Sequence, residues 1–211
     1  MKDWIAPTRT ALLLIDMQVD FAAACGAAGQ AAIAEAASLA DTARAAGAIC
    51  VFVRLITREK DQTPFLREWN SRRNSTDPPP CREGTSGAEF VGPKPLGGEM
   101  VFSKKRYSAF FGTGLDAALR GHGIDTLVVA GLTTECCIDS SVRDAFERDY
   151  HVFVVSDATA CYEPELHVAA LKALALNCAQ IVTADEIRRY WKSLLFQCSR
   201  PHYWGWLGRG P

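Results

Sequence analysis

Short, almost continuously apolar runs recur along this chain, and stretches with helical spacing separate most of them. The first run occupies residues 11–15 and the next residues 49–54, with an alanine-rich helical segment at residues 31–46 between them. An apolar run without alternation is typical of a strand buried on both faces, and parallel strands need a long crossover, usually a helix. This pattern predicts a parallel sheet covered by helices on both sides.

The same alternation continues toward the end of the chain. A capping signature, Thr183 followed three positions later by Glu186, opens the final helix. The sequence therefore predicts an α/β, Rossmann-like, three-layer doubly wound fold with a parallel six-stranded sheet. The other strands are expected at residues 100–103, 126–130, 151–155 and 180–182, and the other helices at residues 65–71, 114–120, 164–176 and from residues 137 and 183 onward.

Length, charge and cysteine usage narrow the class of protein. A chain of 211 residues is expected to form one domain, residues 1–211, and a net charge of −1 gives no electrostatic argument for binding nucleic acid or a membrane surface. No apolar run approaches the roughly 20 residues that cross a bilayer, and the N-terminus lacks the apolar core of a secretion signal. The eight cysteines show no metal-type C-x-x-C spacing. We therefore expect a cytoplasmic protein with reduced thiols.

Two segments depart from the alternation. Residues 57–98 hold six of the ten prolines, several glycines and a basic cluster around Arg67 and Arg72. A loop this long is uncommon inside a compact domain and is usually functional, so we interpret this segment as a substrate-facing insert. Residues 198–211 form an irregular tail rich in aromatic side chains, which either packs across a subunit interface or is disordered.

Three polar residues follow three separate apolar runs. Asp16 ends the first run, Lys104 ends the third, and Cys137 comes shortly after the fourth, where a helix begins. Because the carboxyl ends of parallel strands meet at one edge of a sheet, the three side chains are expected to converge. A lysine ammonium and a helix N-terminus would each lower the pKa of a thiol, and a carboxylate could take its proton. Taken singly, each residue is better explained as a turn, surface or core residue.

Taken together, the residues around these three positions match a known pattern. The motifs D-M-Q-x-D-F from Asp16, K-x-R-Y-S-A-F from Lys104 and G-x-x-T-x-x-C ending at Cys137 occur in this order and spacing. The chain from about residue 9 to residue 187 thereby resembles the isochorismatase-like cysteine hydrolase superfamily. The resemblance implies a parallel six-stranded sheet and a catalytic triad of Asp16, Lys104 and Cys137.

The resemblance also implies how the site is completed. The T-x-x-C spacing from Thr134 selects Cys137 rather than Cys136 as the nucleophile. Relatives have a cis peptide bond that would here join Leu132 to Thr133, and the N–H groups of Thr133 and Cys137 would form the oxyanion hole. From their positions near the motifs and in the insert, we expect substrate-pocket walls at Phe21, Trp69, Tyr107 and Phe110.

The cysteine and the distribution of histidines separate the functions found within the superfamily. Members that hydrolyse amide or ureido C–N bonds carry the cysteine, whereas members that cleave the vinyl ether of isochorismate commonly lack it. Nicotinamidase-like members hold a metal through an Asp and two His, but residues 57–98 contain no His, so we expect no metal and no other cofactor. Residues 82–90 resemble a segment of ureido and carbamoyl hydrolases.

The favoured function is therefore a cysteine amidohydrolase that cleaves a C–N bond of a small amide, carbamoyl or ureido substrate through an acyl-enzyme at Cys137, which water then hydrolyses. The alternatives are a vinyl ether hydrolase of the isochorismatase type, a nicotinamidase-like amidase and a non-catalytic relative that binds a small molecule. By resemblance, the chain is expected to form a homo-oligomer, either a dimer or a tetramer.

Overall fold

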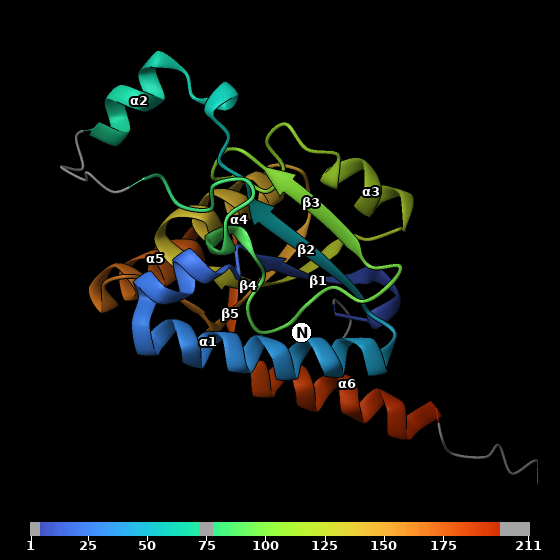
Figure 1. Ribbon diagram of the computed structural model, residues 1–211. Helices are drawn as coiled ribbons and strands as arrows, with labels where there is room; N and C mark the ends of the chain where they lie inside the picture. The colour runs from blue at the N-terminus through green and yellow to red at the C-terminus, as the bar shows by residue number, and fades with distance from the viewer. Residues whose placement is uncertain (1–4, 72–77, 199–211) are drawn as a thin grey trace, which may run out of the picture.

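A parallel sheet lies between two layers of helices in the computed structural model, which describes residues 5–71 and 78–198 (Figure 1). The strands are Thr10–Ile15 (β1), Ile49–Leu55 (β2), Met100–Lys104 (β3), Thr126–Leu132 (β4), His151–Ala160 (β5) and Gln180–Val182 (β6). They form one six-stranded sheet in the order β3-β2-β1-β4-β5-β6, and every pairing is parallel. The predicted parallel six-stranded α/β fold is confirmed.

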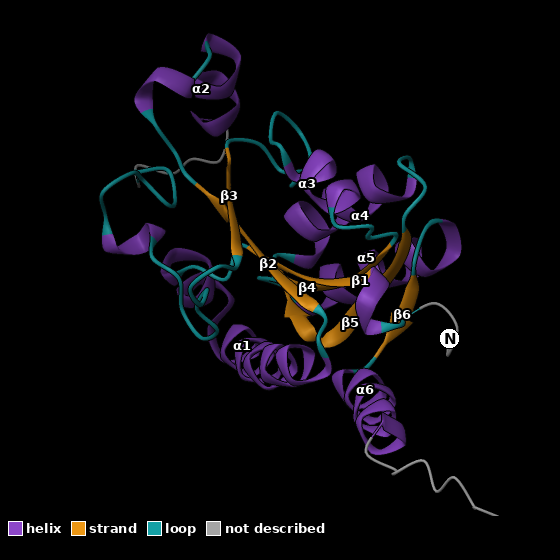
Figure 2. Ribbon diagram, turned by 90° about the vertical axis from the view of Figure 1, so that its right-hand side faces the viewer, coloured by secondary structure: helices purple, strands orange, loops and turns teal. Residues whose placement is uncertain are grey.

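Helices cover both faces of this sheet. They are Val19–Ala46 (α1), Pro64–Ser71 (α2), Leu115–Gly121 (α3), Asp139–Phe146 (α4), Pro164–Asn177 (α5) and Ala184–Cys198 (α6). Figures 1 and 2 show α1 and α6 on one face and α3, α4 and α5 on the other. The short helix α2 belongs to neither layer and stands beyond the carboxyl ends of β2 and β3 (Figure 1).

The central strands are buried on both faces, which explains their continuous apolar sequences. All six residues of β1 are buried. Leu12 and Leu14 join the core under α1 and α6, while Leu13 and Ile15 join the core under α3, α4 and α5. Successive side chains of a strand point to opposite faces, so one strand contributes to two cores. The sheet is thus packed tightly on both faces, and this packing holds the residues at its carboxyl edge in defined positions.

The first helix begins earlier than the sequence predicts. The alanine-rich pattern predicts a helix at residues 31–46, but α1 starts at Val19, directly within the first motif. Gly26 has non-helical angles, with φ 57° and ψ −136°, so two helical segments meet there at a kink. The glycines at positions 26 and 29 lower helix propensity, which hides the first segment from a sequence pattern.

Strand β5 also runs further than the predicted residues 151–155. It pairs with β4 up to Val129, where the register shifts, and pairs again where Gly131 meets Thr159 and Leu132 meets Ala160. This second pairing extends β4 to Leu132. It thereby carries the end of β4 to the carboxyl edge of the sheet.

Polar side chains of the first motif hold the insert at this edge. The insert, residues 57–98, has little regular structure apart from α2 and short helical turns. The Gln18 side chain donates to the carbonyl of Leu55, at the end of β2, and to that of Ala88, within the insert, at 2.9 Å each. The N–H of Cys81 donates to the Asp20 carboxylate at 2.7 Å. These contacts fix the insert above the carboxyl ends of the strands.

The C-terminal part of the chain follows the predicted pattern as far as it is described. The N–H of Glu186 donates to Thr183 Oγ1 at 3.3 Å, and the N–H of Thr183 donates to the Glu186 carboxylate at 2.8 Å, which confirms the capping box. Beyond Cys198, the aromatic tail lies outside the described residues. None of the helices in the described part is long and apolar enough to cross a membrane.

Candidate active site

The side chains of Asp16, Lys104 and Cys137 meet at the carboxyl edge of the sheet. Lys104 Nζ lies 2.7 Å from Asp16 Oδ2, and both side chains are completely buried. The same ammonium donates to Cys137 Sγ at 3.2 Å and to the Arg106 carbonyl at 3.0 Å. Asp16 follows β1 and Lys104 ends β3, on either side of β2, so the two side chains meet across the end of that strand. The expected convergence of the three residues is present.

Burial shifts the proton affinities of the ion pair. Burial by itself lowers the pKa of Lys104, but the charges of Asp16 and Cys137 outweigh it and hold this pKa above its ordinary value. Burial raises the pKa of Asp16, although the ammonium of Lys104 opposes the shift. Hydrogen bonds from Cys137 and from the main chain of Leu55 also lower this pKa, but burial outweighs them. Asp16 is therefore a stronger base than an ordinary carboxylate.

Cys137 is a buried thiol in this resting arrangement. Its pKa lies well above the ordinary value because of the neighbouring Cys136 thiol first, then burial and the charge of Asp16, while Lys104 lowers it. Lys104 lowers this pKa, as the sequence argument expects, but the Cys136 thiol, burial and the charge of Asp16 together outweigh it. A thiolate forms here only when a base takes the proton.

The turn after β4 brings the thiol to the edge of the sheet. The peptide bond between Leu132 and Thr133 is cis. Residues Thr134–Ile138 form a single π-helical turn that leads directly into α4. Just before it, Gly131 has a φ of 143°, and a Cβ at this position would lie 2.0 Å from the carbonyl oxygen of Ile15. Only glycine fits where β4 passes the end of β1 so closely.

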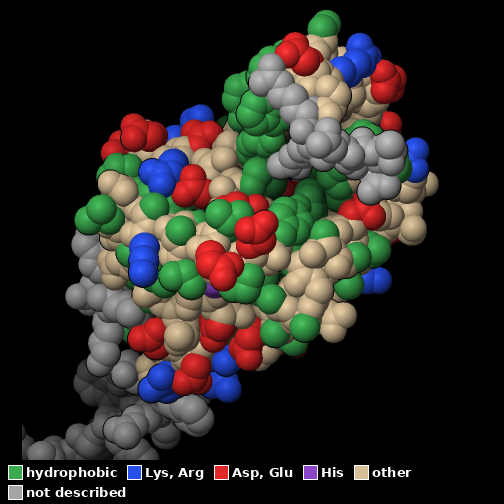
Figure 3. All heavy atoms as spheres, turned by 90° about the vertical axis from the view of Figure 1, so that its left-hand side faces the viewer, with side chains coloured by type: hydrophobic (Ala, Val, Ile, Leu, Met, Phe, Trp, Pro, Cys, Tyr) green, Lys and Arg blue, Asp and Glu red, His purple; other side chains and the backbone are tan. Residues whose placement is uncertain are grey.

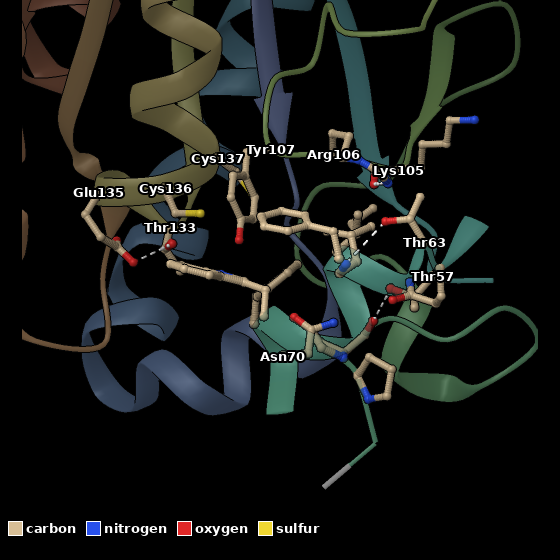
Figure 4. A pocket seen from close by; sticks show the side chains of 18 of the residues that line it. Thr57, Thr63, Asn70, Lys105, Arg106, Tyr107, Thr133, Glu135, Cys136 and Cys137 are labelled. Carbon is tan, nitrogen blue, oxygen red and sulfur yellow. Dashed lines mark hydrogen bonds between the residues drawn. The ribbon is translucent and has the colours of Figure 1, made fainter. Parts of the chain in front are cut away.

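A cavity of about 510 Å³ opens beside the thiol (Figure 4). Its walls come from the insert, from the end of β3 and from the turn between Thr133 and Cys137. Figure 3 shows hydrophobic side chains gathered where the lobe carrying α2 meets the body of the molecule. On α2 itself, the rings of Phe65 and Trp69 stack with centroids 6.3 Å apart, and both line the cavity. The space suits a small molecule with an apolar part.

The structure places the expected pocket residues in two different environments. Phe21, Trp69 and Tyr107 line the cavity. Phe110 does not, because it is 4 % exposed and packs in the core under α3, α4 and α5, with its ring centroid 5.9 Å from that of Tyr150. Its expected place in the pocket wall is thus corrected. Closeness to Lys104 in the sequence does not determine the face toward which a side chain points.

Sequence reasoning missed several residues of the cavity wall. Glu135 lies in a variable position of the third motif, and Tyr162 follows the end of β5. Tyr162 could have been found by the rule that pointed to Asp16, because it too follows a strand at the carboxyl edge of the sheet. Glu135 gave no such signal, since a charged residue at a helix start is ordinarily a solvated one.

Among the residues that the structure describes, no group of three or more His, Cys, Asp or Glu side chains is arranged to hold a metal ion. Of the described histidines, His167 lies near the site, where its Nδ1 is 2.8 Å from Thr134 Oγ1. Burial lowers the pKa of His167, so its ring is neutral at neutral pH. Its contact with Thr134 links α5 to the turn at Thr134–Ile138.

The fold and the site define an isochorismatase-like α/β hydrolase. The model of the isochorismatase domain matches residues 10–186. The chain therefore belongs to the isochorismatase family of hydrolases. Among solved structures, it is similar to an isochorismatase family protein from Desulfovibrio vulgaris, with 32% identity and a TM-score of 0.76 over 89% of this chain and 98% of that one.

Similar proteins carry names that refer to amide chemistry. A protein of Arabidopsis thaliana named as a probable inactive nicotinamidase is 37% identical over 169 residues, which are 76% of this chain and 85% of that protein. The ureidoacrylate amidohydrolase RutB of Rhizobium rhizogenes is 30% identical over 182 residues, 76% of this chain and 74% of the relative. The structure of the nicotinamidase/pyrazinamidase PncA from Bacillus subtilis has 29% identity and a TM-score of 0.72, covering 82% and 99% of the two chains.

Proposed function

We propose that this protein is a cysteine amidohydrolase that cleaves a C–N bond of a small amide, carbamoyl or ureido substrate. The arrangement of the buried ion pair carries the proposal, because Lys104 Nζ lies 2.7 Å from Asp16 and 3.2 Å from Cys137 Sγ beside a cavity of about 510 Å³. The names of RutB and of the nicotinamidase support the choice of an amide-type C–N bond.

The reaction begins with attack of Cys137 Sγ on the carbonyl carbon of the substrate. Asp16 takes the thiol proton as the S–C bond forms, and its raised pKa suits this role. The N–H groups of Thr133 and Cys137 donate to the oxyanion of the tetrahedral intermediate. When the intermediate collapses, the C–N bond breaks, Asp16 returns the proton to the departing nitrogen, and ammonia or an amine leaves. A water then attacks the thioester with Asp16 again as the base, which restores the thiol.

Lys104 keeps the buried site electrically balanced during these steps. In the resting state its ammonium pairs with the Asp16 carboxylate. Once Asp16 holds the proton, the same ammonium lies beside the forming thiolate, to which it already donates a hydrogen bond. One cation therefore faces one anion throughout, which avoids an uncompensated charge in a buried environment.

Ammonia release provides the test. Purified protein is assayed with carbamoyl, ureido, nicotinamide-type and simple aliphatic amides, with and without a chelator. We expect release that a chelator does not affect and that Cys137→Ala lowers by about a thousandfold or more. Cys136→Ala is the matched control, because it removes the adjacent thiol and leaves the proposed nucleophile in place. Full activity in Cys137→Ala would contradict the proposal.

A binding role without catalysis is the second candidate. It is favoured by the similarity to a protein named as probably inactive and by the raised pKa of Cys137. This role predicts no ammonia from any compound of the panel but saturable binding of one of them in calorimetry. A vinyl ether hydrolase instead predicts turnover of isochorismate that survives in Cys137→Ala.

A further inference from the structure

The two proposed oxyanion donors belong to one short turn. The N–H group of Thr133 comes directly before the turn Thr134–Ile138, and that of Cys137 lies within it. The carbonyl of Thr133 closes the turn by accepting hydrogen bonds from the N–H of Cys136 at 3.2 Å and from that of Ile138 at 3.1 Å. Figure 4 shows Thr133, Cys136 and Cys137 together at one end of the lining side chains. The direction of both donors therefore depends on how this turn is held.

Side chains hold the turn at two points. Near its end, the buried Ser141 Oγ donates to the carbonyl of Cys137 at 2.6 Å and accepts from the N–H of Ala109 at 2.9 Å. At its start, Thr134 Oγ1 lies 2.8 Å from Nδ1 of His167, a residue of α5. The first anchor joins the turn to the segment between β3 and α3, and the second joins it to α5.

The contact at the start of the turn has a definite direction. Thr134 is completely buried, and within residues 5–71 and 78–198 its hydroxyl has no hydrogen-bond partner other than His167. If the imidazole donated, the hydroxyl hydrogen would be left without an acceptor, which is costly in a buried environment. Burial also lowers the pKa of His167, so its ring is neutral at neutral pH and one of its nitrogens can accept. Thr134 Oγ1 therefore donates to Nδ1, and Nε2 carries the proton of the ring.

Thr134 and His167 stand behind the cavity wall. Neither is among the described residues that line the cavity, whereas the chain neighbours of Thr134, which are Thr133 and Glu135, both line it. A rotation of Thr134 would thus move the wall on either side of it. His167 can therefore influence the reaction through Thr134 without touching the substrate.

We propose that His167 is a positioning residue of the reaction, which accepts the hydrogen bond of Thr134 Oγ1 and thereby aims the N–H groups of Thr133 and Cys137 at the oxyanion. This inference rests on the proposed amidohydrolase function. Donors of an oxyanion hole stabilise the transition state when they point at the place where the negative charge develops. A small misplacement caused by a residue outside the site can lower the rate substantially. Loss of the contact should therefore lower kcat and leave the binding of the amide unchanged.

Three variants test the contact with the amide that the wild type hydrolyses fastest. Thr134→Val removes the donor with little change of shape, His167→Leu removes the acceptor, and His167→Asn keeps an acceptor oxygen close to the position of Nδ1. In the first two variants, kcat should fall about tenfold to a hundredfold, with KM within about twofold of the wild type. His167→Asn should recover most of kcat. His122→Leu is the matched control with both constants unchanged, because His122 is exposed after α3 and does not line the cavity.

The double variant shows whether the two side chains act as one unit. Because both single changes remove the same hydrogen bond, Thr134→Val/His167→Leu should lower kcat no further than either one alone. Multiplied effects would mean that the two residues act separately and would overturn the inference. A rise of KM at unchanged kcat, which a merely structural loosening of the cavity wall predicts, would overturn it as well. In each of these cases ammonia is still released, so the proposed function stands.

Aldehyde binding separates the inference from the proposed function. The Cys137 thiol adds across the C=O bond of pyridine-3-carbaldehyde or propanal, which forms an S–C bond and an O–H. The oxygen of this tetrahedral adduct lies where the oxyanion would form, so the adduct resembles the intermediate. Calorimetry should show a Kd about tenfold or more higher in His167→Leu than in the wild type, and one close to the wild type in His167→Asn.

These Kd values decide the inference even without turnover. If the wild type releases no ammonia from the panel, the proposed function falls, and the expected pattern of Kd values would still assign the positioning role to His167. Equal Kd values in the wild type, His167→Leu and Thr134→Val would overturn the inference. If no amide reacts and neither aldehyde binds, both proposals are overturned.

Discussion

Replacing Lys104 by methionine should destabilise the protein strongly and make its stability depend on pH. Lys104 and Asp16 are both fully buried and form the closest ion pair of the site, at 2.7 Å. Removal of the ammonium leaves a buried carboxylate without its charged partner. Breaking a buried ion pair in this way costs about 3–5 kcal/mol of the free energy of unfolding. For a chain of this length, that corresponds to a decrease in Tm of about 6–20 °C.

The pH dependence has a definite sign. Burial raises the pKa of Asp16 in the folded protein, and without Lys104 nothing charged opposes this shift. A carboxyl group whose folded pKa exceeds its unfolded value stabilises the fold fully below the unfolded pKa, and this contribution is lost as pH rises through the folded pKa. Lys104→Met should therefore be closest to the wild type near pH 4 and lose stability progressively toward neutral pH.

Urea unfolding followed by circular dichroism between pH 4 and pH 8 measures this effect. Lys105→Met is the matched control, because Lys105 is exposed and only 3.6 Å from Asp61 in a surface pair, worth about 1 kcal/mol or less. The double variant Asp16→Asn/Lys104→Met should recover most of the loss and remove the pH dependence. A loss below about 1 kcal/mol in Lys104→Met, or one that the double variant does not relieve, would show that the unpaired charge of Asp16 is not what destabilises this variant.

Three further predictions concern the parts that position the site. Gly131→Ala should lower the free energy of unfolding, measured by urea titration, by about 3 kcal/mol or more. The reason is that its Cβ would lie 2.0 Å from a main-chain oxygen at a φ of 143°. Gly121→Ala is the control and should lower this free energy far less, because a Cβ at Gly121 meets open space. Asp20→Ala removes the acceptor of the Cys81 N–H and should lower the free energy of unfolding by about 1–2 kcal/mol. Limited proteolysis within the insert should become faster, and an unchanged cleavage rate would contradict this role of Asp20. Alkylation of Cys137 by iodoacetamide, mapped by mass spectrometry, should be slow at pH 7 and still rise above pH 9, because its pKa is raised; a plateau below pH 8 would show a preformed thiolate.

The sequence was most informative where one physical effect dominated. Apolar runs predicted all six strands, most directly β1, β2, β4 and β5, whose central residues are buried on both faces of the sheet. The rule that strand carboxyl ends share one edge predicted the meeting of Asp16, Lys104 and Cys137, although 121 positions separate the first and last. The capping signature of Thr183 and Glu186 also predicted the start of the last helix correctly.

Sequence reasoning failed where competing effects decide the outcome. The first part of α1 was missed because Gly26 and its neighbours weaken the helical signal, while packing of Phe21 and Cys25 into the core overrides propensity. Phe110 was placed in the pocket because sequence proximity does not give side-chain direction. The net direction of the thiol pKa was misjudged, since the Cys136 thiol and burial, followed by the charge of Asp16, outweigh the lowering by Lys104.

Detection of an acyl-enzyme on Cys137 is the decisive test of the proposed mechanism. The protein is mixed with a substrate from the ammonia assay, quenched with acid during turnover, digested and examined by mass spectrometry. We expect the acyl group of the substrate as a thioester on Cys137, none on Cys136, and no adduct in Cys137→Ala. Steady turnover with no adduct on Cys137, or with the adduct on Cys136, would rule out Cys137 as the nucleophile.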